Sequence, residues 1–211
     1  MEKPAPVVHP IHDLLRRRWS PRTFASKPVS PETLRSLFEA ARWAASCFND
    51  QPWAYVVATK DDPENFEKML GVLVEGNAVW ARQAPVLMLS LARLNFAHNS
   101  KPNRHAFHDV GAASASLTCE ATARGLAVHQ MGGFYVDKAR EVFSIPPDWE
   151  PVAAIALGYP VDNLDATPPE LREREFAPRQ RKPIEEFVMT GNFGRISSLV
   201  QSSNEKQRAR G

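Results

Sequence analysis

Cysteines and long apolar runs are scarce in this sequence. The two cysteines, Cys47 and Cys119, lie far apart and form no C-x-x-C pair, so neither a disulfide framework nor a zinc site is predicted. The opening residues, MEKPAPVVHP, lack the apolar stretch of a secretory signal, and no run of about 18 apolar residues marks a membrane-spanning helix. We therefore expect a cytoplasmic protein with no membrane partner.

Glycine-rich phosphate motifs and a strong excess of one charge are also absent. Neither G-x-G-x-x-G nor a P-loop occurs, so a Rossmann or Walker phosphate site is not supported. The 26 Lys and Arg against 24 Asp and Glu leave a formal charge of +2, which does not by itself indicate a nucleic-acid partner. The 211 residues, 43% of them hydrophobic, are sufficient for one domain with a substantial core.

Hydrophobic periodicity and capping residues predict interleaved helices and strands. The helix at 30–46 is the clearest, with Ser30 as N-cap and Pro31 at the first helical position. Gly125 is placed to end a helix that is rich in small residues, and Asp137 is the expected N-cap of a later one. The expected helices are 11–19, 30–46, 63–74, 105–124 and 137–143, with a short candidate at 184–189; the expected strands are 53–60, 84–92, 126–134 and 151–160.

These elements do not follow a regular βαβ rhythm, so the fold class is predicted to be α+β, or mixed α/β, in a single domain. We expect an N-terminal arm at 1–11, the domain at 12–190, and a C-terminal extension at 191–211 that ends in a frayed tail.

Two arginine clusters, distant in sequence, offer the same chemistry. Arg18 and Arg22 flank Ser20 in RRRWSPRTF, and Arg179 and Arg181 follow in APRQRKP. A guanidinium suits a phosphate, to which a serine hydroxyl can also donate, so one phosphate could satisfy both clusters. Two alternatives stay open: the clusters are simply solvated, or they contact the phosphates of a nucleic acid in a non-enzymatic basic domain.

Two further segments suit a flat ligand. In ASCFNDQPW, Ser46, Asn49 and Gln51 supply donors and acceptors for a planar heteroaromatic edge, although a polar loop with turn contacts would explain them equally well. In HQMGGF, Gly132 and Gly133 follow an apolar strand and let the backbone approach a ligand, although a simple turn explains them too.

These elements occur in a fixed order: R-W-S-P-R-x-F, then A-S-x-x-N-x-Q-P-W, then G-G-F, then P-R-x-R-K-P. In this order and spacing, residues 12 to 188 resemble the nitroreductase family of FMN-dependent oxidoreductases. The resemblance implies a nitroreductase-like fold, in which a central mixed β-sheet is flanked by helices. It also implies a homodimer with one FMN per subunit, bound at the subunit interface.

The resemblance also assigns roles. Arg18, Ser20 and Arg22 would hold the phosphate and ribityl chain, with Trp19 as a backbone contact and Arg179 and Arg181 closing on the phosphate. The partner subunit would contribute flavin contacts from its ASCFNDQPW segment, namely Ala45, Ser46, Cys47, Asn49 and Gln51. Main-chain N–H groups near flavin N5 would come from Gly132 and Gly133. The small-residue helix at 111–116 would pack in the dimer core.

This chain departs from better-known members of the family in two ways that bear on the substrate pocket. It has Gly132 where many bacterial members carry an acidic residue, so only backbone contacts to the ring are expected there. The stretch between Leu94 and His105 is short where members of the family have a segment that helps to roof the pocket. The pocket is therefore expected to be open, or roofed by Phe48 and Trp80.

The function implied is hydride transfer from NADH or NADPH through FMN to a quinone, nitroaromatic or similar small acceptor, by a ping-pong mechanism with no catalytic side chain. Other activities on the same flavin fold, as a dehydrogenase, a dehalogenase or a flavin-fragmenting enzyme, stay open. His105, His108 and Asp109 could face a metal from one helical turn, but no third distant ligand is evident and no metal is predicted. Cys47 has no recognisable partner as a nucleophile.

Overall fold

The computed structural model describes residues 2–161 and 167–200. The chain forms two compact units, Met1–Ala177 and Pro178–Gly211, and each is described by itself. The tail at 202–211 that was expected to fray lies outside the described residues. None of the described helices is long and apolar enough to cross a membrane.

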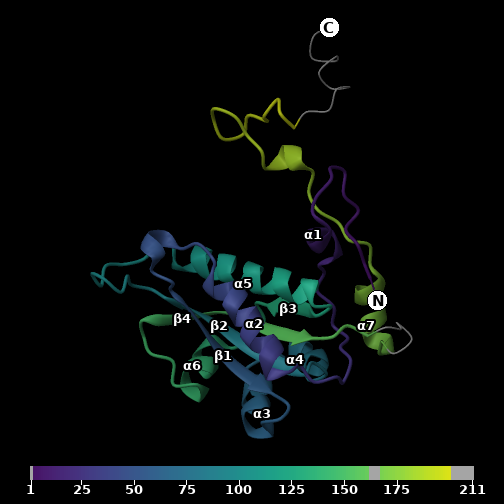
Figure 1. Ribbon diagram of the computed structural model, residues 1–211, viewed down its shortest axis with the longest axis vertical. Helices are drawn as coiled ribbons and strands as arrows, with labels where there is room; N and C mark the ends of the chain where they lie inside the picture. The colour runs from purple at the N-terminus through teal and green to yellow at the C-terminus, as the bar shows by residue number, and fades with distance from the viewer. Residues whose placement is uncertain (1, 162–166, 201–211) are drawn as a thin grey trace. The chain divides into compact units, whose positions relative to one another are not determined.

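A four-stranded sheet forms the centre of the first unit (Figure 1). Its strands are β1 (Trp53–Thr59), β2 (Val86–Arg93), β3 (Ala127–Met131) and β4 (Trp149–Gly158). They lie in the order β1-β2-β4-β3, and every neighbouring pair is antiparallel. The expectation of an α+β fold is confirmed, but a mixed sheet would need a parallel neighbour that the described residues of this chain do not supply.

The two central strands are apolar on both faces, which requires a layer of helices on each side. In β2, Met88 points into the core that α2 and α5 cover, whereas Leu87 and Leu89 point into the core on the opposite face. In β4, Ile155 joins the first of these cores and Ala154 the second. Period-two alternation along apolar strands therefore fixes the three-layer architecture.

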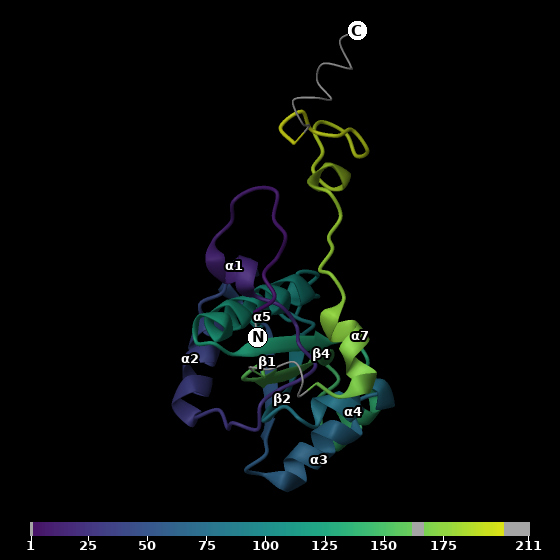
Figure 2. The ribbon, with the colours of Figure 1, turned by 90° about the vertical axis from the view of Figure 1, so that its right-hand side faces the viewer.

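Figures 1 and 2 show the two helical layers of the first unit, with α2 and α5 against one face of the sheet and α3, α4 and α6 against the other. The helices of the first unit, including two that lie outside these layers, are α1 (Asp13–Arg17), α2 (Pro31–Arg42), α3 (Pro63–Gly71), α4 (Glu75–Ala81), α5 (Ala106–Ala123), α6 (Val136–Val142) and α7 (Pro169–Phe176). In the second unit, the candidate at 184–189 is a 3₁₀ turn, η3 (Ile184–Glu186).

Two helix ends follow the expected capping chemistry. The Ser30 hydroxyl accepts the Thr33 N–H at 3.2 Å, and Gly125 follows α5 with φ of 73°. One predicted cap is wrong: Tyr135 occupies the N-cap of α6, and Asp137 lies in its first turn. Helices α4 and α7 were not predicted, because neither carries a side-chain N-cap and α7 has only a weak apolar face.

A close approach at the end of β4 makes Gly158 a test of this packing. A Cβ atom there would lie 2.5 Å from Pro85 Cδ and 3.1 Å from Phe24 Cδ1. Because these neighbours are rings in or beside the packed core, we expect Gly158→Ala to lower the free energy of unfolding by about 1–3 kcal/mol. The control is Gly76→Ala in α4, where no heavy atom lies within 4 Å. Equal urea midpoints for the two variants would contradict this packing.

Candidate functional site

The loop that follows α1 carries the first predicted cluster, and two distant residues anchor it. The Arg22 main-chain N–H donates to the carboxylate of Glu175 in α7, a side chain that is only 2% exposed. On the other side, His129 Nδ1 in β3 lies 2.8 Å from the Pro21 carbonyl oxygen, so Nδ1 is the protonated ring nitrogen and donates. Arg18 Nη1 reaches the Ser20 hydroxyl at 3.4 Å. The loop is thus held through its backbone.

The Arg22 guanidinium lies beside Trp80, 6.0 Å from the centre of the indole ring. No carboxylate in the described part of the chain lies within ion-pair distance of it. Trp80 also contacts His129, whose ring centre is 4.6 Å from that of Trp80, with the two ring planes tilted by 41°. Burial lowers the pKa of His129, and the Arg22 charge lowers it further, so the imidazole is neutral near pH 7. Among the described residues, Arg22 therefore has no carboxylate as a counter-ion.

A cavity of about 250 Å³ adjoins this loop. Arg17, Arg18 and Trp19 line it from one side. The other lining residues come from the end of α5, the turn that leads into β3, the first residue of β3, the N-terminal arm and the segment after β4: Thr122, Gly125, Leu126, Ala127, Glu2 and Pro160. Two predicted cofactor residues, Arg18 and Trp19, therefore border a cavity in the described structure.

The paired glycines follow β3 and lie against the start of α4. Asn77 Nδ2 donates to the Gly133 carbonyl at 2.9 Å, and the Val74 N–H donates to the same oxygen at 3.2 Å. A Cβ on Gly133 would come within 2.6 Å of Asn77 Nδ2, whereas one on Gly132 would meet no atom within 4 Å. Neither glycine N–H has a main-chain carbonyl partner in the described structure. The carbonyl is fixed while both N–H groups stay available.

The second predicted segment forms a 3₁₀ turn, η1 (Cys47–Asn49), just before β1. It is fastened to α5, because the Cys47 N–H donates to Asp109 Oδ2 at 2.9 Å. Within the segment the Gln51 N–H donates to the Ser46 hydroxyl at 3.1 Å, and the Gln51 side-chain amide donates to the Asn49 carbonyl at 3.1 Å. Asp109 is thus a structural partner of this turn, and sequence reasoning had considered it only as a metal ligand.

The structure brings the first and third segments together, because His129, three residues before Gly132, holds Pro21. It places η1 elsewhere. The turn precedes Trp53, which pairs with Ala92 and through it with Glu150, whereas His129 pairs with Ala156. Glu150 and Ala156 are six positions apart, which is about 20 Å along β4. The three strand spacings from β1 to β3 add about 14 Å across the sheet.

The remaining predicted residues are distributed as follows. Arg179 and Arg181 belong to the second unit, where Arg181 Nη1 donates to the Gln180 carbonyl at 2.7 Å, so their closure on a phosphate stays a prediction. Trp80 is 1% exposed, and its Nε1 has no hydrogen-bond partner in the described structure. The segment 18–22 after α1 is called the arginine loop below. The sequence did not predict Glu175 and His129 as its anchors, since nothing in the local sequence links either to Pro21 or Arg22.

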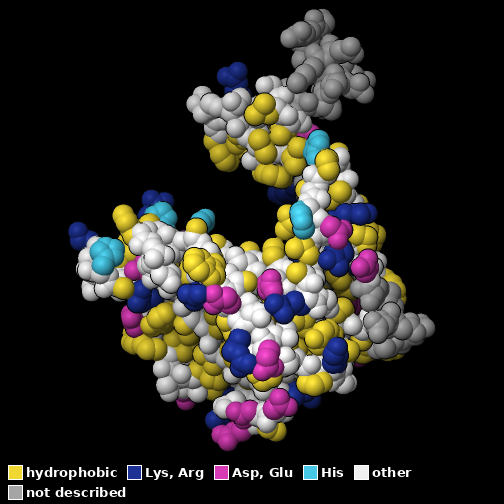
Figure 3. All heavy atoms as spheres, in the orientation of Figure 1, with side chains coloured by type: hydrophobic (Ala, Val, Ile, Leu, Met, Phe, Trp, Pro, Cys, Tyr) yellow, Lys and Arg dark blue, Asp and Glu magenta, His cyan; other side chains and the backbone are white. Residues whose placement is uncertain are grey.

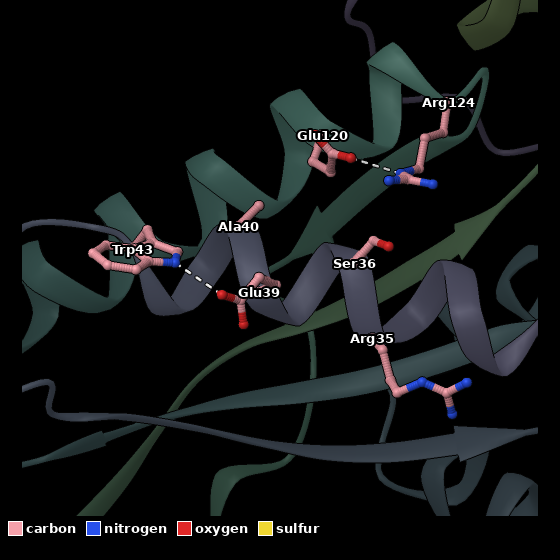
Figure 4. A pocket seen from close by; sticks show the side chains of 7 residues that line it. All are labelled: Arg35, Ser36, Glu39, Ala40, Trp43, Glu120 and Arg124. Atoms are coloured by element: carbon pink, nitrogen blue, oxygen red, sulfur yellow. Dashed lines mark hydrogen bonds and ion pairs between the residues drawn. The ribbon is translucent and has the colours of Figure 1, made fainter.

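A surface groove of about 540 Å³ lies between α2 and α5 (Figure 4). Its charged side chains are already paired: Glu39 accepts from Trp43 Nε1 at 2.8 Å, Glu120 contacts Arg124 at 2.6 Å, and Arg35 contacts Glu32 at 2.6 Å. None of the predicted cofactor residues lines the groove. No group of three or more His, Cys, Asp or Glu side chains in the described residues is arranged to hold a metal ion.

Comparison with known proteins gives four concordant matches. The family model described as "Nitroreductase family" matches residues 15–159. An FMN reductase [NAD(P)H] of Bacillus subtilis is 26% identical over 164 residues, covering 70% of this chain and 64% of the relative. A crystal structure of an oxidoreductase containing FMN superposes with a TM-score of 0.84 at 34% identity, covering 90% of this chain and 96% of that one. A Desulfovibrio desulfuricans protein in complex with FMN gives a TM-score of 0.65 at 25% identity, covering 85% and 95%.

The buried His129 predicts a pH dependence of stability. Burial lowers the pKa of His129 in the folded protein below its ordinary value of 6.5. As the pH falls through about 6.5, the unfolded chain therefore binds a proton that the folded protein does not, and the free energy of unfolding decreases. We expect His129→Gln, which keeps a donor for the Pro21 carbonyl, to lose less melting temperature than wild type between about pH 7.5 and pH 5. The control is His9→Gln on the exposed arm; a wild-type slope in the His129 variant would contradict the burial of a neutral imidazole.

Proposed function

The chain belongs to the nitroreductase family, and from that premise we propose that it is an FMN-dependent oxidoreductase acting by a ping-pong mechanism. It takes hydride from NADH or NADPH and passes it to quinones, nitroaromatics or similar small acceptors. Bound FMN would supply the hydride chemistry, and the protein would supply binding and orientation. The observation that carries the proposal is Arg22, a cation fixed by two backbone anchors and left without a carboxylate partner in the described structure.

The loop from Arg18 to Arg22 is suited to an anionic cofactor. Arg22 presents a planar donor fork, and Arg18 and Ser20, 3.4 Å apart, present a second charged donor and a hydroxyl. The anchors act on main-chain atoms, so side-chain donors need not be withdrawn from a ligand to keep the loop in place. Arg179 and Arg181 of the second unit are proposed to complete the phosphate contacts.

Gly132 and Gly133 are suited to the flavin ring. Their N–H groups lack main-chain partners, and the absence of a side chain at Gly132 leaves the approach clear. Hydrogen-bond donors at this point would stabilise negative charge that develops on the ring during reduction. Arg22 follows Pro21, which His129 of β3 holds, and its positive charge would favour the same charge distribution.

The separation of η1 from the arginine loop supports a homodimer. One chain places them about 20 Å apart along the sheet and about 14 Å apart across it, too far for both to line one small site. A two-fold axis can bring the turn of one subunit to the arginine loop of the other. We propose that Ala45, Ser46, Cys47, Asn49 and Gln51 reach the flavin in this way. A cytoplasmic homodimer that needs no membrane or nucleic-acid partner completes the proposal.

The proposal predicts a yellow protein whose colour depends on Arg22. We expect the wild-type flavin bands to bleach with NADH or NADPH under anaerobic conditions and to return with a quinone. Arg22→Ala should lower the flavin bound per chain by about tenfold or more, since charge-assisted bonds to the phosphate are lost. The matched control is Arg35→Ala, which removes an arginine already paired with Glu32. Full flavin content and turnover in the Arg22 variant would contradict the assignment.

The shared site predicts complementation between two defective variants. Asn49→Gly removes the side chain and suits the φ of 54° at that position, and Arg22→Ala removes the cation. A mixed dimer of the two holds one site with both residues intact, so unfolding and refolding an equal mixture should restore about a quarter of the wild-type flavin sites. Each variant refolded alone is the control. Recovery no greater than the mean of the two would contradict a site built from two chains.

A further inference from the structure

The turn after β3 is fastened to the start of α4 by main-chain hydrogen bonds. The Tyr135 N–H donates to the Val72 carbonyl at 2.8 Å, and the Val74 N–H donates to the Gly133 carbonyl at 3.2 Å. These two bonds join the segments through main-chain atoms alone. A side chain that also reaches the turn therefore needs a further explanation.

Asn77 of α4 is such a side chain. Its Nδ2 donates to the Gly133 carbonyl at 2.9 Å, so this oxygen accepts a second hydrogen bond besides that from Val74. A Cβ atom on Gly133 would lie 2.6 Å from Asn77 Nδ2, because the amide occupies the space that a side chain at 133 would need. A larger residue at 133 would displace the Asn77 amide.

The bond from Asn77 is the first of a chain of hydrogen bonds through two peptide units. The Phe134 N–H, in the same peptide unit as the Gly133 carbonyl, donates to the Gly132 carbonyl at 3.2 Å and closes a γ-turn. The next peptide unit joins the Gly132 carbonyl to the Gly133 N–H. Both units are trans, so the carbonyl and the N–H of each point in opposite directions. The chain ends at the Gly133 N–H, which has no main-chain partner in the described structure.

Such a chain changes the strength of its last donor. Each hydrogen bond polarises the next one and strengthens it by about 10–30%. The Gly133 N–H is therefore a stronger donor than a peptide N–H outside such a chain. The gain is largest toward a charged acceptor, because charge-assisted hydrogen bonds are about twice as strong as neutral ones. The geometry thus prepares one donor for an anionic acceptor without adding a charge.

Charge on the protein surface is a poor substitute for such a donor. The formal charge of the chain is only +2. Figure 3 shows Lys and Arg side chains intermixed with Asp and Glu side chains over the face of the first unit that it draws. Charges on an exposed surface are also screened beyond about 10 Å at 0.1 M salt. Stabilisation of a new negative charge therefore depends mainly on groups that contact it.

We propose that Asn77 is a positioning residue that raises the reduction potential of the bound flavin by strengthening the Gly133 N–H. This inference rests on the proposed function, in which Gly133 donates to the flavin ring. Hydride from NADH or NADPH carries two electrons and one proton, so its transfer leaves NAD⁺ or NADP⁺ and adds one negative charge to the ring. A stronger donor favours the reduced, charged ring over the oxidised, neutral one. Asn77 acts on this balance without touching the ring.

The test uses two variants that remove the amide and differ in volume. Asn77→Leu keeps nearly the same volume, Asn77→Ala leaves a space, and both residues favour a helix. A role as a donor requires the two variants to behave alike, whereas a role in packing requires Asn77→Leu to resemble wild type. The matched control is Asn65→Leu in α3, where the Asn65 amide donates to the exposed Asp62 carboxylate at 2.6 Å.

We expect both Asn77 variants to bind oxidised FMN within about twofold of wild type and reduced FMN about fivefold more weakly. At about 29.6 mV for each tenfold change in a two-electron couple, this lowers the reduction potential by about 20 mV. Anaerobic titration against a dye of known potential measures the shift, and the Asn65 control should keep the wild-type value. Equal weakening of both flavin forms, or a wild-type potential in Asn77→Leu, would overturn the inference.

A second measurement needs no flavin. Gly132-Gly133 is the only Gly-Gly pair in the sequence. In flavin-free, full-length protein labelled with glycine that carries ¹³C at the carbonyl and ¹⁵N, an NMR experiment that correlates each amide with the preceding carbonyl therefore selects the Gly133 N–H. Its proton resonance should move upfield in both Asn77 variants and not in the control, because a less polarised N–H is less deshielded. An unmoved resonance would overturn the inference, whereas a wild-type protein that binds no flavin would overturn the proposed function itself.

Discussion

The strand pairing that leads to η1 meets β4 at Glu150, and His129, which holds Pro21, pairs with β4 at Ala156. These two points lie six positions apart along β4. The apolar alternation of β2 and β4 fixes this separation, because each strand must bury one set of side chains under α2 and α5 and the other under α3, α4 and α6. A register shift would exchange the two sets. The rigid sheet therefore keeps the two candidate half-sites apart in every copy of the chain.

The arginine loop shows how a cation can be kept ready for a ligand. Glu175 is almost fully buried and could have paired with a guanidinium, yet it accepts the main-chain N–H of Arg22. His129 also acts on the backbone, and its neutral ring adds no charge. A carboxylate paired with the Arg22 side chain would have competed with a phosphate. Anchoring through the main chain fixes the loop without that competition.

The sequence predicted those features that depend on local chemistry. Ser30 and Gly125 mark helix ends because a hydroxyl cap and a left-handed glycine act within a few residues. The buried strand at 84–92 was identifiable because all of its residues except Ser90 are apolar. Helix α7 carries no such signal. It contributes Glu175, which accepts the main-chain N–H of Arg22, 153 positions away in the chain. Likewise, the 108 positions between Pro21 and His129 hide an anchor that only the fold makes visible.

The candidate site was predictable to a similar extent. The order of its motifs predicted the family, which the family model confirms, whereas the assignment of cofactor contacts to particular residues stays a prediction. Exposure and ring contacts could not be read in the same way: Phe48 and Trp80 are both aromatic residues beside polar segments, yet one is 80% and the other 1% exposed. Burial depends on the packing of α4 against the sheet, which no local pattern specifies.

Placing the two half-sites on opposite ends of one rigid sheet has a genetic consequence. In the proposed homodimer, a substitution in η1 and a substitution in the arginine loop of the same chain would alter different flavin centres, so each segment can vary without changing the centre that the other one lines. Two diverged copies of the gene that still assemble together would produce a mixed dimer with two unlike centres. Such a dimer could carry two acceptor preferences on one scaffold, and duplication alone would supply the variety.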